Sequence, residues 1–110
     1  MSNELSNNDY KSILELKDLL RKKFGALIEE VYCYGSKVYA RKEDTDFDIL
    51  IVTVKKIDWK EESKIFSEIY EFGVFRDLQF DVKFFSEDEF KNAYSEMPFI
   101  KNILSYGIQI

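Results

Sequence analysis

The sequence predicts an α/β domain in which a small mixed β-sheet has helices packed against it. Apolar residues at helical spacing alternate along the chain with extended apolar runs. One such run, 47–54 (FDILIVTV), is apolar on both faces, as in a central covered strand. Another, 78–85 (LQFDVKFF), alternates between apolar and polar residues. At 110 residues, the whole range 1–110 is expected to form a single domain with one core.

The first third of the chain is expected to hold one helix and one strand. Asn7 or Asn8 can cap a helix that ends at Gly25, with apolar residues at helical spacing between them. The segment 27–35 (LIEEVYCYG) follows as a strand, in which Cys33, the only cysteine, is expected to be buried.

Capping residues mark the later helices. Asp58 with Glu61 makes a capping pair for a second long helix, whose apolar positions are Ile65, Phe66, Ile69 and Phe72. Ser86 with Glu89 forms a capping box after the third strand. The only proline, Pro98, is expected to start a last short helix that ends near Gly107.

Charge and hydropathy exclude several classes of protein. A net charge of −5 argues against a general nucleic-acid binder, which needs basic surface to replace counterions on phosphates. No apolar run approaches the roughly 20 residues that span a bilayer. The polar start, MSNELSNNDY, does not resemble a secretory signal, so a cytoplasmic protein is expected.

The absence of histidine restricts the chemistry most. Without histidine there is no Ser-His-Asp or Cys-His nucleophile and no histidine-ligated metal site. A single cysteine also excludes an internal disulfide and a thiolate zinc cluster. An enzyme with this composition must work with carboxylates, hydroxyls, lysine and arginine, and carboxylate oxygens suit hard cations such as magnesium.

Two aspartates open the buried strand. Asp46 and Asp48 are two residues apart, so in an extended chain their carboxylates share one face and repel each other. A divalent cation reverses that repulsion. Asp81, on the polar face of the third strand, adds a third carboxylate if the two strands are neighbours. Three convergent carboxylates without histidine indicate a magnesium site of the kind used in phosphoryl transfer.

A Gly-Ser pair supplies the second half of the predicted site. Gly35 lies at a strand end, where glycine lets the backbone approach a phosphate closely. The Ser36 hydroxyl and the amides of a helix start can then hold that phosphate. Lys37 and Arg41 are near enough in sequence to neutralise developing charge. Each feature has an ordinary alternative, since acid-x-acid pairs recur by chance among 21 acidic residues and Gly-Ser is a common turn. Their conjunction carries the prediction.

The segment GSKVYARKEDTDFDILIV (35–52) resembles the signature of the nucleotidyltransferase superfamily of DNA polymerase beta type. In size the chain is most similar to the minimal nucleotidyltransferases, which often act beside a separate helical HEPN-domain protein. The resemblance extends from the first helix through 80–90 and includes the tail 97–110. It departs at Ala40, where many members have a second glycine, and in the short spacing of nine residues between Ser36 and Asp46.

The resemblance implies a polymerase-beta-type fold and roles for single residues. Asp46 and Asp48 would bind two magnesium ions, with Asp81 as the third catalytic carboxylate. The nucleotide-binding residues would be Gly35, Ser36, Lys37 and Arg41. The implied reaction moves AMP, or another NMP, from an NTP such as ATP to a hydroxyl and releases pyrophosphate. In toxin–antitoxin pairs of this kind the small enzyme adenylylates the HEPN toxin.

Two other functions stay open: transfer to a small molecule or an RNA end, and a non-catalytic module that neutralises a partner by binding. Because no second domain is available for the acceptor, a partner chain is expected to complete the site. Among the many aromatic residues, Tyr39, Trp59, Phe75 and Tyr94 are candidates for partner contacts, although a small domain is expected to bury most of its aromatic residues.

Overall fold

The sheet is mixed, as the sequence predicts. The computed structural model describes residues 5–35, 38 and 46–110, and within them the sheet has the strand order β3-β2-β1-β4. β1 (Ile28–Tyr34) is antiparallel both to β2 (Phe47–Thr53) and to β4 (Ile108–Gln109). β2 is parallel to β3 (Phe80–Ser86).

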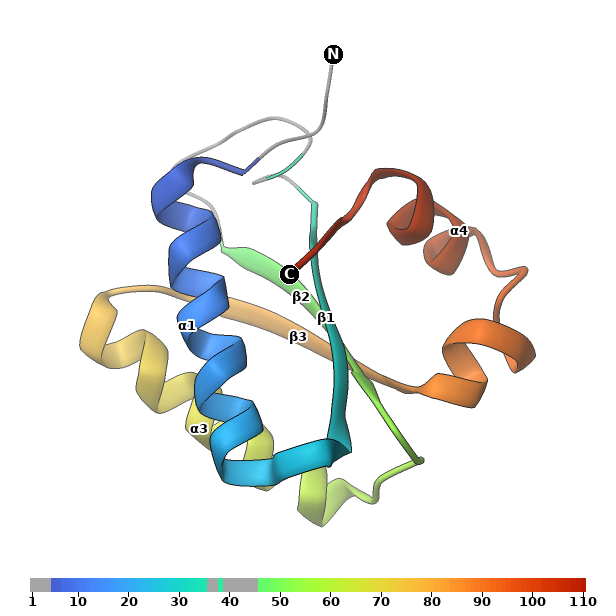
Figure 1. Cartoon of the computed structure of the whole chain (residues 1–110), viewed down its shortest axis with the longest axis horizontal. Helices are drawn as coiled ribbons and strands as arrows, with labels where there is room; N and C mark the ends of the chain where they lie inside the picture. Colours follow the sequence, from blue (N-terminus) through green and yellow to red (C-terminus); the bar gives the residue numbers. More distant parts are fainter. Residues whose placement is uncertain (1–4, 36–37, 39–45) are drawn as a thin grey trace.

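Helices cover both faces of the sheet (Figure 1). α1 (Asn7–Phe24) and α3 (Trp59–Arg76) lie on one face, and a short 3-10 turn, η1 (Gly25–Leu27), leads from α1 into β1. A π-helical turn, η2 (Glu89–Ala93), and α4 (Pro98–Tyr106) lie on the other face. The result is a three-layer α/β/α arrangement. Within the described residues, no helix has both the length and the apolar character needed to cross a membrane.

β2 is the centre of the core. Its odd-numbered residues Phe47, Ile49 and Ile51 pack among buried side chains of α1 and α3. Leu50 and Val52 pack on the opposite face with side chains of η2 and α4. The prediction of a strand covered on both faces is therefore confirmed, and so is the burial of Cys33 in β1.

Local hydrogen bonds confirm the later helix starts. The Asp58 carboxylate accepts from the Glu61 N–H at 2.9 Å. Ser86 and Glu89 form a complete capping box: the Ser86 N–H donates to Glu89 Oε1 at 2.9 Å, and the Glu89 N–H donates to Ser86 Oγ at 3.2 Å. Pro98 opens α4, as predicted.

The predicted cap of the first helix is wrong by one residue. Ser6, not Asn7 or Asn8, is the N-cap, and its hydroxyl accepts from the Asp9 N–H at 3.1 Å. Ser6 has the extended backbone (φ −61°, ψ 156°) that a cap requires, whereas both asparagines are already helical. The helix ends before Gly25, as expected.

Several large aromatic side chains are exposed, including Trp59, Phe75 and Tyr94, which the sequence offers as candidates for partner contacts. Helical spacing predicts Phe66 on the buried side of its helix, but its side chain is 47% exposed. Trp59 and Phe75 are 71% and 78% exposed, and Tyr94 is also exposed. Tyr39 lies outside the described residues. α3 therefore carries large apolar side chains on faces that the core does not use.

Candidate active site

Asp48 and Asp81 lie side by side. They are direct partners in the parallel register of β2 and β3. Paired residues of neighbouring strands project to the same face of a sheet, so both carboxylates lie on the side opposite α1 and α3. The sequence predicts this meeting only if the two strands are neighbours, and in the structure they are.

The electrostatics of Asp48 show that the carboxylates interact. Burial raises the pKa of Asp48, and the negative charges of Asp81 and, less strongly, Asp46 raise it further, while Lys83 opposes the shift. A hydrogen bond between the Asp48 and Asp81 carboxyl groups also raises it. The chain therefore holds a partly buried carboxyl group where its ionised form is disfavoured, which is the situation that a bound cation relieves.

Asp81 is the accessible member of the pair. Its side chain is 57% exposed, and its Oδ2 atom lies 3.8 Å from the Nζ of Lys83 on the same face of β3. Lys83 belongs to the polar face that the sequence predicts for this strand, but the pattern alone does not indicate a function for it. In the structure, Lys83 is a positively charged residue that lies next to the carboxylate pair.

Gly35 is in close contact with Asp48. Its φ of +79° belongs to the region that favours glycine, and a Cβ built there would lie only 2.9 Å from Asp48 Cγ. The preceding residue, Tyr34, is the β1 partner of Asp48. The Gly35 carbonyl accepts from the N–H of the buried Val38 at 3.0 Å. The group close to this glycine in the structure is the Asp48 carboxylate, and the predicted approach of a phosphate stays a prediction.

The structure brings together four of the predicted site residues: Gly35, Asp46, Asp48 and Asp81. Asp46 is exposed, immediately before β2, and close enough for its charge to affect Asp48. Ser36, Lys37 and Arg41 lie outside the described residues, so their predicted contacts with phosphate stay predictions.

The carboxylates match magnesium in donor type. Among the described side chains, no group of three or more carboxylates or thiols is arranged to hold a metal ion. Magnesium does not need such a group, because it is commonly bound by one or two carboxylates together with waters and substrate phosphates. The adjacent pair Asp48 and Asp81 fits that requirement.

Comparison with known proteins supports the fold. No family model matches the chain, and no curated protein matches it. Among solved structures, the chain is similar to one chain in a crystal structure of a mutant form of the toxin–antitoxin complex MntA-HpeT. The match has a TM-score of 0.56 and 16% identity, and it covers 97% of this chain and 72% of that one. At this identity the likeness shows a shared fold.

The contact of Gly35 with Asp48 predicts a specific energetic coupling. Gly35→Ala should destabilise the domain through both backbone strain and collision with Asp48. In an Asp48→Ala background the collision is gone, so the cost of Gly35→Ala should fall by about 1 kcal/mol or more. Urea unfolding of the four variants measures this coupling.

Gly25→Ala is the matched control, because Gly25 also has a positive φ (+62°) but a Cβ there would meet nothing within 4 Å. Its cost, about 1–3 kcal/mol of strain, should be the same in both backgrounds. If the cost of Gly35→Ala also stayed the same, the proposed contact would be wrong.

The raised pKa of Asp48 predicts a pH-dependent gain of stability in Asp48→Asn. The wild type loses stability as the pH rises through the pKa of folded Asp48, because folding then retains a disfavoured charge. Asp48→Asn should therefore melt a few degrees higher at pH 7, and the gain should vanish below about pH 4, where the carboxyl is protonated in both states. Thermal unfolding followed by circular dichroism tests this, with the exposed Asp18→Asn as control. A lower melting temperature for Asp48→Asn at pH 7 would contradict it.

Proposed function

We propose that this chain is a magnesium-dependent nucleotidyltransferase that moves AMP, or another NMP, from an NTP to a hydroxyl group on a separate protein. The observation that carries the proposal is the register of β2 and β3. It sets Asp81 beside Asp48, and Asp48 in turn lies against Gly35. Three segments distant in the sequence thus bring together Gly35, Asp48 and Asp81, which supports the roles that the resemblance to the polymerase-beta-type signature implies.

The proposed reaction is a substitution at the α-phosphorus. The acceptor oxygen forms a bond to that phosphorus, the bond from phosphorus to the bridging oxygen breaks, and pyrophosphate leaves. The proton of the hydroxyl passes to Asp81, whose exposed carboxylate is open to an incoming group. Bound magnesium supplies charge neutralisation and alignment of the phosphates.

The other residues position the nucleotide in this proposal. Asp46 and Asp48 would hold two magnesium ions together with the phosphates of the nucleotide, and Asp81 would contribute a further carboxylate oxygen. Gly35 and Ser36 hold the triphosphate, with Lys37 and Arg41 neutralising its charge. ATP is the proposed donor. Lys83, 3.8 Å from Asp81, balances the charge of the carboxylates before nucleotide and metal arrive.

A partner protein is the proposed acceptor, for two reasons. The similar solved structure is a toxin–antitoxin complex, and therefore contains two proteins. This chain also exposes large aromatic side chains such as Trp59 and Phe66, which favour contact with another protein, and its net charge of −5 disfavours an RNA end. We therefore propose an antitoxin role, with a helical HEPN-type toxin as the partner.

The proposal is tested by the intact mass of the helical protein encoded in the adjacent reading frame after incubation with this chain, ATP and magnesium. One or more added AMP units are expected. Asp48→Asn should lower the rate at least about 100-fold, since it removes a charge that holds the metal. Asp18→Asn should leave the rate unchanged. A stable complex with no added mass would contradict the proposal and favour neutralisation by binding alone.

A further inference from the structure

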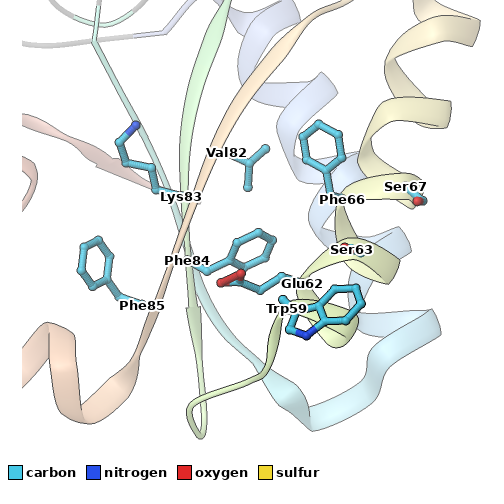
Figure 2. A pocket seen from close by; sticks show the side chains of 9 residues that line it. All are labelled: Trp59, Glu62, Ser63, Phe66, Ser67, Val82, Lys83, Phe84 and Phe85. Carbon is cyan, nitrogen blue, oxygen red and sulfur yellow. The ribbon is translucent and has the colours of Figure 1, made fainter.

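A groove runs along the outer edge of β3 (Figure 2). It has a volume of about 650 Å³. Four consecutive residues, 82–85, line it, although Val82 and Phe84 point toward α3 whereas Lys83 and Phe85 point to the other face of the sheet. A groove that all four line must follow the edge of the strand itself. We call it the edge groove; its remaining lining residues come from α3 and are Trp59, Glu62, Ser63, Phe66 and Ser67.

The edge groove exposes backbone groups that can pair with another strand. β3 is the outermost strand of the sheet as far as the structure describes the chain. The Phe47 N–H donates to the Gln79 carbonyl at 2.9 Å, which fixes the phase of the parallel ladder. In such a ladder alternate residues face the partner, so the N–H and C=O groups of Asp81 and Lys83 point toward β2. Those of Val82 and Phe84 therefore point into the edge groove.

The edge groove follows the same strand that carries Asp81. Phe66 also lines a second hollow, of about 470 Å³, which reaches Asp46 between α3 and the start of β3. Along β3 itself, Phe85 and Asp81 are four residues apart, about 13 Å in an extended strand. An added segment of about five residues would therefore span the distance from the groove to the carboxylates.

The two hollows have a defined chemical character. Their walls contain exposed or half-exposed aromatic rings, including Trp59 and Phe66. The acidic residues among their lining side chains are Glu62 in the edge groove and Asp46 and Asp77 in the second hollow. The one basic residue among the described lining side chains is Lys83. These walls complement a segment that carries apolar and basic side chains, and they disfavour an acidic one.

We propose that the partner protein presents its acceptor hydroxyl in an extended segment that adds to the outer edge of β3 as a further strand. Its backbone pairs with Val82 and Phe84, apolar side chains pack against Trp59 and Phe66, and basic side chains face the acidic residues of the two hollows. The hydroxyl then lies beside Asp81. This inference rests on the proposed function, and it adds the form in which the acceptor is recognised.

Amide hydrogen exchange tests the strand pairing independently of catalysis. The ¹⁵N-labelled chain is measured alone and in complex with the protein of the adjacent reading frame. The amides of Val82 and Phe84 should exchange at least about tenfold more slowly in the complex. Those of Asp81 and Lys83, which already face β2, are the internal control and should change much less. Unchanged exchange at Val82 and Phe84 would overturn the proposal, and so would slowing in the isolated chain at high concentration, because a second copy would then cover the edge.

Side-chain variants test the groove through the kinetics. Trp59→Ser combined with Phe66→Ser should raise KM for the partner at least about tenfold and leave ATP binding unchanged. Phe75→Ser is the matched control and should leave KM for the partner unchanged, since Phe75 is more exposed than either residue but lies outside both hollows. Slowed exchange at Val82 and Phe84 without AMP transfer would reject the proposed function and keep the docking mode. AMP transfer without slowed exchange would keep the proposed function and reject the docking mode.

Discussion

The candidate active site depends on the parallel pairing of β2 with β3. It sets Asp48 against Asp81, and the alternation of each strand then sends Ile49 and Val82 into the core on the opposite face. A shift of the register by one residue would place a carboxylate among the side chains of α1 and α3, where the burial of its charge is expensive. The hydrophobic core thus holds the acidic pair in place, and the like charges of the pair are tolerated because the core is large.

Gly35 connects this pair to β1. Its lack of a side chain lets β1 end against the Asp48 carboxylate, and its positive φ turns the chain toward Val38, which is buried in the main core. The opposite side of β3 is built differently. There the outer backbone edge of β3 and the aromatic residues of α3 stay accessible. In a domain of 110 residues, apolar surface that stays exposed does not contribute to the free energy of folding. We interpret the edge as the surface that a partner completes.

Most of the architecture could be predicted from local pattern. Each of several features depends on only a few adjacent residues: the strands in 47–54 and 78–85, the helix caps at Asp58 and Ser86, and the helix start at Pro98. The register that joins Asp48 to Asp81 could not be derived, because pairing depends on contacts between strands about thirty residues apart. β4 has two residues, too few for any periodicity. The exposure of Phe66 could not be predicted either, because helical spacing shows that a face is apolar but does not show what covers it.

If Asp48 and Asp81 form one cation-dependent site, magnesium must stabilise the folded chain through both carboxylates, and thermal unfolding measures this. A ligand that binds the folded chain raises its melting temperature. Magnesium should therefore raise the melting temperature of the wild type and of Asp18→Asn by the same amount, and that of Asp48→Asn and Asp81→Asn by much less. Equal shifts in all four proteins would contradict it, because the ion would then bind elsewhere.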